Sequence, residues 1–288
     1  PSMKTILFVF AAVLLVQAAF AASRTNPNAG HTGLRMAAGK FDRIFIVQFE
    51  NQPFMFVKDD PNFKKYTQMG VHLTNYYAVT HPSQPNYWTQ VAGDHFMVFS
   101  DGVYNWNKTT LVDLMEPKGV SWKGYMEDLP YECYAGANKG AYYRKHNPFI
   151  SFDNIRNNPA RCAKVVNAKQ LDADLAAGTL PQYSYYTPNI NNDGHDTGLA
   201  YAGRFLDSFL APRLAKFPPR TLLLITWDED DYLDNNHISS VAIGSMLQAG
   251  TTDNTLYNHF SLLRTVEDNW NLGTLGRYDQ TANSFQFL

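Results

Sequence analysis

The 288-residue sequence lacks an excess of positive charge, because 24 Lys and Arg residues are balanced by 26 Asp and Glu residues. A chain with this balance has no basic surface of the kind that attracts phosphate backbones or acidic membranes. It also lacks an amphipathic basic segment, an internal repeat and a low-complexity tract. We therefore expect one large hydrophobic core, no nucleic-acid partner and no stable membrane association.

A hydrophobic run long enough to span a bilayer is missing near the N-terminus. The apolar stretch 6–16 follows the positive Lys4 and is shorter than the ~20 residues that a span needs. Small residues at 19–21 suit signal peptidase, so we predict a signal peptide over 1–21, with Pro1 and Ser2 as a scar before the first methionine. A membrane anchor is the alternative. We expect a secreted protein with a flexible lead-in at 22–40 and a single domain at 41–288.

Cysteine is scarce, with only Cys133 and Cys162 in the chain. In an oxidising secretory route these two thiols can pair without competitors, so we predict a disulfide between them. A free buried pair is the alternative, and a metal pair would need more ligands nearby. The sequon that begins at Asn107 (Asn-Lys-Thr) predicts a glycosylation site.

Two runs of β-branched and aromatic residues, 43–49 and 221–227, predict strands that are buried on both faces. Weaker strand patterns occur at 71–78, 122–126, 183–186 and 239–243. Helical spacing of apolar residues appears at 197–217 and 257–270. Strands separated by helices predict an α/β fold, with a mostly parallel central sheet flanked by helices on both faces.

Both of the strongest strands run directly into acidic or amide residues. Glu50 and Asn51 follow the first strand, and Asp228 and Glu229 follow the second. Ligands of open α/β sheets bind at the carboxyl ends of strands, so the two clusters could face one site with oxygen ligands for Mg, Ca or Mn. Either cluster alone is better explained by a loop start or a helix cap.

Ser83 lies two residues before Pro85, and proline favours the first turn of a helix. A serine at that place meets free backbone N–H groups and the positive end of the helix dipole. Both features can hold a phosphate and stabilise a serine alkoxide next to a metal. The local pattern also fits an ordinary N-cap serine, which is the commoner role.

Six short segments along the chain combine serine, histidine, carboxylate and amide residues. They are 49–51 (Phe-Glu-Asn), 81–87 (His-Pro-Ser-Gln-Pro-Asn-Tyr), 144–149 (Arg-Lys-His-Asn-Pro-Phe), 192–196 (Asn-Asp-Gly-His-Asp), 227–229 (Trp-Asp-Glu) and 258–265 (Asn-His-Phe-Ser-Leu-Leu-Arg-Thr). In this order they resemble the phosphoesterase family of fungal secreted acid phosphatases and bacterial phospholipases C, within the alkaline phosphatase superfamily. The resemblance covers about 41–287 and implies an alkaline-phosphatase-like core.

The resemblance implies that Ser83 is the nucleophile that becomes phosphorylated. Glu50 and Asn51 would be the first pair of metal ligands, and Asp228 and Glu229 the second. Relatives carry two aspartates or an Asp-His pair at the second position. The glutamate at 229 therefore leaves the divalent ion open among Mg, Ca, Mn and Zn.

Four histidines fall inside the matching segments, and by resemblance they line the phosphate pocket. His195 and His259 are assigned catalytic roles, while the assigned substrate-binding residues are His81, Lys145, His146 and Asp196. A protonated histidine can bind phosphate oxygens and donate a proton to the leaving alkoxide, which favours an acidic pH optimum. The alternatives are a second metal held with Asp193 or Asp196, a structural role for at least one histidine, and a merely solvated Lys145.

The resemblance predicts a secreted acid phosphatase that hydrolyses small phosphate esters through a phosphoserine on Ser83, with metal assistance. A phosphodiesterase or phospholipase C of the same family would share every residue named above. A secreted binding protein on the same fold would be expected to lack the nucleophile or a carboxylate ligand, and this chain has both.

Overall fold

A computed structural model describes residues 39–288 of the chain. The predicted signal peptide, and the lead-in as far as residue 38, lie outside the described residues. None of the helices within 39–288 is both long and apolar enough to cross a membrane. The boundary predicted at residue 41 stays a prediction.

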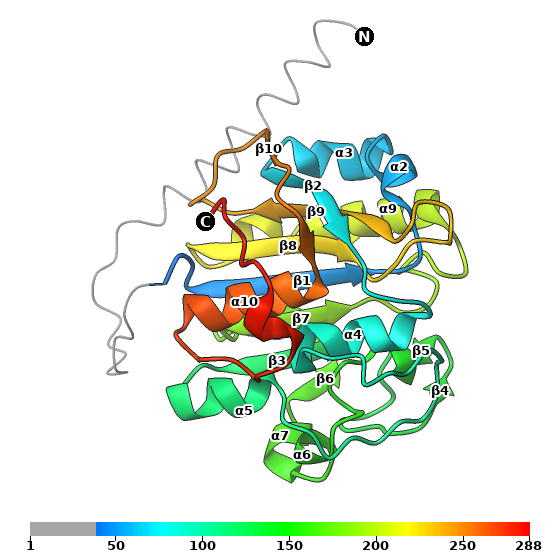
Figure 1. Ribbon diagram of the computed structural model, residues 1–288, viewed down its shortest axis with the longest axis vertical. Coiled ribbons are helices and arrows are strands. Elements are labelled where there is room, and N and C mark those ends of the chain that lie inside the picture. The colour runs from blue at the N-terminus through cyan, green and yellow to red at the C-terminus, as the bar shows by residue number, and fades with distance from the viewer. Residues whose placement is uncertain (1–38) are drawn as a thin grey trace, which may run out of the picture.

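Within the described residues, nine strands form one central sheet and two more form a small separate sheet (Figure 1). The strands are β1 (Arg43–Phe49), β2 (Val71–Tyr77), β3 (Trp122–Met126), β4 (Asn138–Lys139), β5 (Tyr142–Tyr143), β6 (Val165–Asn167), β7 (Tyr183–Thr187), β8 (Thr221–Trp227), β9 (His237–Ile243), β10 (Thr251–Asp253) and β11 (Tyr257–Asn258). The order in the central sheet is β10-β2-β9-β8-β1-β7-β3-β6, and β11 also pairs with β2.

Most neighbouring strands of the central sheet run parallel, and only β9 pairs antiparallel, with β2 and with β8. The two most strongly predicted strands, β1 and β8, are direct parallel neighbours, with Phe49 opposite Trp227. The chain therefore leaves both strands at the same edge of the sheet. Glu50 and Asp228 follow at that edge as neighbours, although they are far apart in sequence.

Helices cover both faces of this sheet. The α-helices are α2 (Phe54–Val57), α3 (Pro61–Thr67), α4 (Ser83–Ala92), α5 (Leu111–Met115), α6 (Asp153–Arg156), α7 (Pro159–Cys162), α8 (Gln170–Ala177), α9 (Leu199–Leu210) and α10 (His259–Asn269). Short 3-10 helices are η1 (Glu116–Lys118), η2 (Arg144–His146), η3 (Leu214–Lys216) and η4 (Tyr278–Thr281). In Figure 1, α4 and α10 lie in front of the sheet and α9 lies behind it, which confirms the predicted α/β architecture.

One predicted helix is shorter than expected. The pattern at 197–217 predicts a continuous helix, but α9 ends at Leu210 and a separate 3-10 turn follows at 214–216. Pro212 explains the break, because proline has no backbone N–H to donate and its ring clashes with the preceding turn of a helix.

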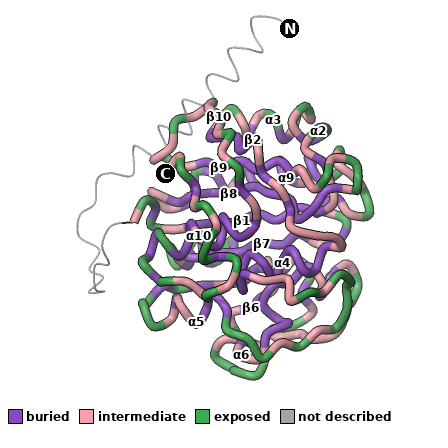
Figure 2. Tube along the Cα trace, in the orientation of Figure 1, coloured by how far each residue is buried: buried purple, intermediate pink, exposed green. Residues whose placement is uncertain are grey.

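The core of the molecule is built on the central strands. Figure 2 shows them as continuous buried segments, while exposed residues gather in the outer loops. All seven residues of β8 are buried, as are the last six of β1. Where the two strands end, the ring of Phe49 packs against Trp227 at 5.2 Å between centroids. This packing supports the sheet edge at which the polar residues emerge.

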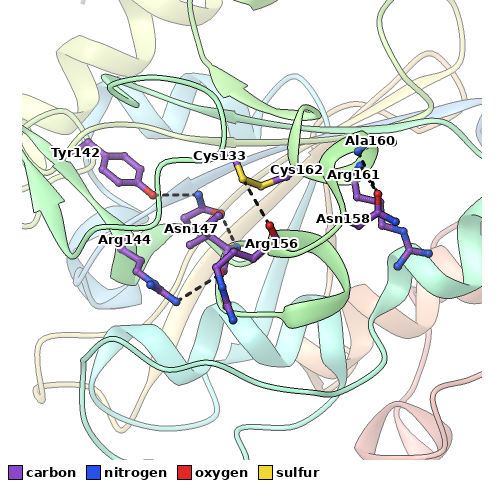
Figure 3. Close-up of a disulfide and its surroundings, with 10 residues drawn as sticks. Cys133, Tyr142, Arg144, Asn147, Arg156, Asn158, Ala160, Arg161 and Cys162 are labelled. Carbon is purple, nitrogen blue, oxygen red and sulfur yellow. Dashed lines mark hydrogen bonds between the residues drawn. A yellow bond between two sulfur atoms is a disulfide. The ribbon is translucent and has the colours of Figure 1, made fainter.

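Cys133 and Cys162 form the predicted disulfide (Figure 3), with 5.1 Å between their Cα atoms. The bond closes a segment of 29 residues that contains β4, β5 and η2. Inside this segment the buried Arg144 donates to the carbonyl oxygens of Ala135 at 2.6 Å and Tyr104 at 2.7 Å. The disulfide and Arg144 together hold the turn that carries Lys145 and His146.

Candidate active site

Ser83 is the first residue of α4, and it lies beside the carboxyl ends of β1 and β8. Its side chain is almost fully buried, with 1% of the residue exposed. The Oγ atom lies 3.0 Å from Oε2 of Glu50 and 3.1 Å from Oε1 of Glu229. The hydroxyl makes no capping bond to the helix backbone. Ser83 is therefore not the N-cap serine that its local pattern also allowed.

The two carboxylates compete for one hydrogen, because a serine hydroxyl has only one to donate. The second contact needs a proton on a carboxyl group or a cation among the oxygens. Burial, followed by repulsion from Glu50, raises the pKa of Glu229. Burial raises the pKa of Asp228 well above its usual value, and the charges of Glu50 and Glu229 add to this. Together, Glu50, Asp228 and Glu229 thus bring more negative charge into the site than the surrounding residues neutralise.

Asp228 connects the two strand ends. It is fully buried, and its Oδ1 accepts the backbone N–H groups of Asn51 at 3.0 Å and Glu229 at 2.7 Å. Asn51 has a left-handed backbone with φ of 61°, a conformation that asparagine tolerates. The other oxygen of Asp228, Oδ2, has no hydrogen-bond partner among the described residues. An unpartnered buried carboxylate oxygen beside Glu50 and Glu229 fits a divalent cation.

A second cluster shares Glu50. Ligand atoms of Glu50, His146 and Asp193, all buried, lie within 4.8 Å of one another and could hold a metal ion. His146 Nε2 lies 3.3 Å from Glu50 Oε2, and Nδ1 lies 3.1 Å from Asp193 Oδ2. Burial opposes charge on this ring, yet the two carboxylates raise the pKa of His146 to about 9. Without an ion, His146 is therefore an imidazolium that bridges two carboxylates.

The same contacts shape the acidity of the two carboxylates. Burial alone would raise the pKa of Glu50, but the charge and hydrogen bond of His146 lower it to about 2. Burial raises the pKa of Asp193 to about 6 despite the same imidazole. Glu50 is therefore the carboxylate that stays ionised at mildly acidic pH.

His81 orients Glu229 from the outer side of the site. Its Nδ1 lies 2.8 Å from Glu229 Oε2, and its Nε2 lies 3.2 Å from Oδ1 of the buried Asp230. Burial disfavours the charged ring, but these carboxylates raise the pKa of His81 overall. The amide of Asn86 lies 3.4 Å from the same Glu229 oxygen. Glu229 is thus held from two sides with Oε1 turned toward Ser83.

Lys145 and His195 meet at the more exposed side of the site. Lys145 Nζ lies 3.2 Å from Asp101 Oδ2 and 3.1 Å from His195 Nε2, and His195 Nδ1 lies 2.7 Å from Asp196 Oδ1. Nε2 of His195 therefore faces Lys145, and its Nδ1 faces Asp196. Burial disfavours the charge of Lys145, but Glu50 and Asp101 raise its pKa. A permanent positive charge therefore faces the carboxylates.

His259 occupies a different environment from the other three predicted histidines. It is fully buried, and its Nε2 lies 2.6 Å from the backbone carbonyl oxygen of Asp228, to which it donates. Burial lowers the pKa of His259 to about 4, so the ring is neutral. His259 therefore contacts the backbone of Asp228 and not a carboxylate of the site. Its catalytic assignment stays a prediction.

Three contacts involve residues to which the sequence analysis gave no role. The hydroxyl of Tyr87 donates to Glu50 Oε1, and Tyr87 lies one helical turn after Ser83 on the same face of α4. Because Tyr87 belongs to the matching segment 81–87, the sequence could have indicated that it lies in the site. Asp101 accepts the backbone N–H of Gln84 at 3.0 Å, and Asp230 accepts from His81. For Asp101, no sequence pattern indicated its place.

Comparisons with known proteins agree with the sequence resemblance. A model of the phosphoesterase family matches residues 52–273, starting just after Glu50 and Asn51. A probable acid phosphatase of Kluyveromyces lactis is 40% identical over 263 residues, which is 86% of this chain and 62% of the relative. An acid phosphatase of Aspergillus fumigatus is 38% identical, and the aligned residues make up 59% of that relative. This chain therefore spans about three fifths of the length of these fungal relatives.

A bacterial relative and a solved structure extend the comparison. A phosphatidylinositol-3-phosphatase of Mycobacterium tuberculosis is 30% identical over 243 residues, covering 82% of this chain and 79% of the relative. A crystal structure of an alkaline phosphatase superfamily protein from Vibrio parahaemolyticus superimposes with a TM-score of 0.59 at 14% identity. It covers 94% of this chain and 78% of the other. At this identity the likeness shows the fold.

Proposed function

We propose that this chain, which belongs to the phosphoesterase family, hydrolyses phosphate monoesters as an acid phosphatase with Ser83 as its nucleophile. One observation carries the proposal. The Oγ atom of Ser83, at the start of α4, lies 3.0 Å from Glu50 and 3.1 Å from Glu229 at the carboxyl ends of two adjacent strands. The fungal relatives named acid phosphatase, 38% and 40% identical, support the monoester activity.

The donor set fits a divalent ion, since Asp228 Oδ2 is buried beside two further carboxylates and has no partner within residues 39–288. The residues that would hold it are Glu50, Asn51, Asp228 and Glu229, with Mg, Ca, Mn or Zn as candidates. When bound, such an ion withdraws charge from the phosphoryl oxygens and lowers the pKa of a serine hydroxyl. His146 and Asp193 offer further ligand atoms next to Glu50.

In the first half of the proposed cycle, Ser83 Oγ attacks phosphorus and the bond to the leaving oxygen breaks. The hydroxyl proton passes to Glu229, whose Oε1 lies 3.1 Å from Ser83 Oγ. Lys145 binds a phosphoryl oxygen with its permanent charge. His195, beside Lys145, donates its proton to the leaving alkoxide and stays deprotonated until the second half of the cycle.

In the second half, a water attacks the phosphoserine from the side that the alcohol has left. His195 accepts a proton from this water, the bond between phosphorus and Ser83 Oγ breaks, and Glu229 returns the proton to the serine. Inorganic phosphate is the product. The positioning residues are His81, which holds Glu229 at 2.8 Å, and Tyr87, which donates to Glu50.

We also propose that the protein is secreted and glycosylated at Asn107, which is exposed in the loop before α5. The Cys133–Cys162 disulfide supports an oxidising compartment, because such bonds are rare in the cytosol.

The test compares phenyl phosphate, bis(p-nitrophenyl) phosphate and phosphatidylcholine as substrates, before and after chelation and after adding back each of the four ions. We expect fast hydrolysis of the monoester, loss of activity on chelation and recovery with one of the ions. Faster hydrolysis of the diester or the lipid would favour the phosphodiesterase or phospholipase C alternative. Full activity after complete metal removal would refute metal assistance and leave the phosphatase assignment standing.

A further inference from the structure

Tyr232 lies in the loop between β8 and β9 and is unusually exposed for a large aromatic residue, at 73%. Its backbone is left-handed, with φ of 68°, a conformation that costs free energy in a bulky residue. Its N–H donates to Oδ1 of the buried Asp230 at 2.9 Å, which holds the loop in this shape. The chain thus maintains a strained backbone that presents an aromatic ring to solvent.

The ring of Tyr232 stacks on His81, with 3.9 Å between ring centroids and 21° between the planes. His81 in turn lies 2.8 Å from Glu229, and Glu229 lies 3.1 Å from Ser83 Oγ. One face of the tyrosine therefore covers a ring that is two contacts away from the nucleophile. The high exposure of the residue leaves its other face open to solvent.

Charged groups around the ring place it at the opening of the site. His81, on which the ring of Tyr232 stacks, contacts the carboxylates of Glu229 and Asp230. Asp101 contacts Lys145 and the backbone of Gln84, next to Ser83. Tyr232 therefore lies on the His81 side of the candidate site, and Asp101 lies on the side of Lys145.

The direction in which the alcohol leaves determines which residues it can contact. In an in-line displacement the leaving alcohol lies on the side of phosphorus opposite the attacking oxygen. Ser83 is buried, whereas His81, Lys145 and Asp101 have side chains that are 20%, 17% and 30% exposed. The alcohol therefore points toward these partly exposed residues and toward Tyr232.

On this basis, which rests on the proposed function, we propose that the open face of Tyr232 binds the alcohol part of the substrate and makes the enzyme favour aromatic over small alkyl phosphate esters. A stacked or edge-on aromatic pair adds roughly three- to tenfold to an affinity. A small alkyl group has too little surface to gain as much from the ring.

The test measures binding with two probes that cannot be hydrolysed. Benzylphosphonate mimics phenyl phosphate and ethylphosphonate mimics methyl phosphate, because a methylene replaces the ester oxygen in each. Calorimetry is carried out on the metal-supplemented wild-type protein and on Y232F, Y232A and L233A. Leu233 is the matched control, since it is the next residue and is also exposed, at 59%.

We expect wild type, Y232F and L233A to bind benzylphosphonate about three- to tenfold more tightly than ethylphosphonate, and Y232A to lose this difference. If Y232A weakens both probes by the same factor, the ring serves only to hold His81 and the proposal is overturned. Equal affinities in the wild type, or no binding of either probe, overturn it too.

Hydrolysis of phenyl phosphate and methyl phosphate is measured in parallel. We expect Y232A to lower kcat/KM for the phenyl ester by the same three- to tenfold and to change the methyl ester less than twofold. If the wild type hydrolyses neither ester, the proposed function fails. The phosphonate affinities still decide the role of Tyr232 in that case.

Discussion

The hydroxyl oxygen of Ser83 lies 3.0 Å from Oε2 of Glu50, although 33 positions separate the two residues. Ser83 begins α4 and Glu50 follows β1, so the contact joins a helix N-terminus to a strand end. His146 keeps Glu50 ionised by lowering its pKa to about 2, against the effect of burial. A carboxylate that stays charged next to a buried serine suits metal binding and activation of the hydroxyl.

Replacing Ser83 by alanine should abolish turnover and leave the fold intact. Loss of a nucleophile lowers kcat by about 10⁴-fold or more, whereas one missing hydroxyl changes the free energy of unfolding by about 1 kcal/mol. The measurements are phenyl phosphate hydrolysis and thermal unfolding of S83A. The control is S208A, which removes an exposed hydroxyl from α9. Residual activity above about 1% of wild type would rule out Ser83 as the nucleophile.

Replacing Asp228 by asparagine should stabilise the metal-free protein and prevent metal binding. The amide keeps the oxygen that accepts the N–H groups of Asn51 and Glu229, and it removes the repulsion from Glu50. We expect the melting temperature without metal to rise by a few degrees, corresponding to about 1–2 kcal/mol. Added Mg, Ca, Mn or Zn should raise it in the wild type only. A metal-dependent shift of normal size in D228N would contradict the assigned ligand set.

Glu267 should make stability fall as pH rises. Its residue is 1% exposed, its carboxylate oxygens have no donor among the described residues, and burial followed by the charge of Asp279 raises its pKa to about 9. Below about pH 4.5 the group is protonated in both the folded and the unfolded chain. Between there and pH 9 only the unfolded chain releases the proton, so the free energy of unfolding decreases by up to about 1.4 kcal/mol per pH unit.

Urea unfolding at pH 5.5 and pH 8.5 checks this effect in the wild type and in E267Q. The glutamine variant should show a flatter decrease, because it has no proton to lose. The control is D268N, which changes a carboxylate on the same helix that is 43% exposed and paired with Arg264. Equal pH slopes in wild type and E267Q would show that Glu267 does not titrate in this range.

Removing the disulfide should destabilise the protein and weaken substrate binding. Closing a segment of 29 residues restricts the unfolded chain by about 3–4 kcal/mol. The segment contains Lys145 and His146, so a C133S/C162S variant should also show a higher KM for phenyl phosphate. Urea unfolding and steady-state kinetics measure the two effects. An unchanged KM would mean that Arg144 alone holds this turn.

The sequence by itself determined the strands and the residues that end them. The runs at 43–49 and 221–227 are mostly apolar on both faces, which predicts central strands of a covered sheet, and both strands were found where predicted. The six matching segments also indicated the family, which the comparisons confirm. For Ser83, however, the local pattern allowed a helix cap as readily as a nucleophile.

Only the tertiary structure decided which groups contact one another. Glu229 lies 146 positions from Ser83, and no local pattern encodes the packing that brings the start of α4 beside the end of β8. His146 and His259 come from equally good motif matches, yet one bridges two carboxylates and the other donates to a backbone carbonyl. Burial and hydrogen-bond partners set the charge of each ring, and both are properties of the folded chain.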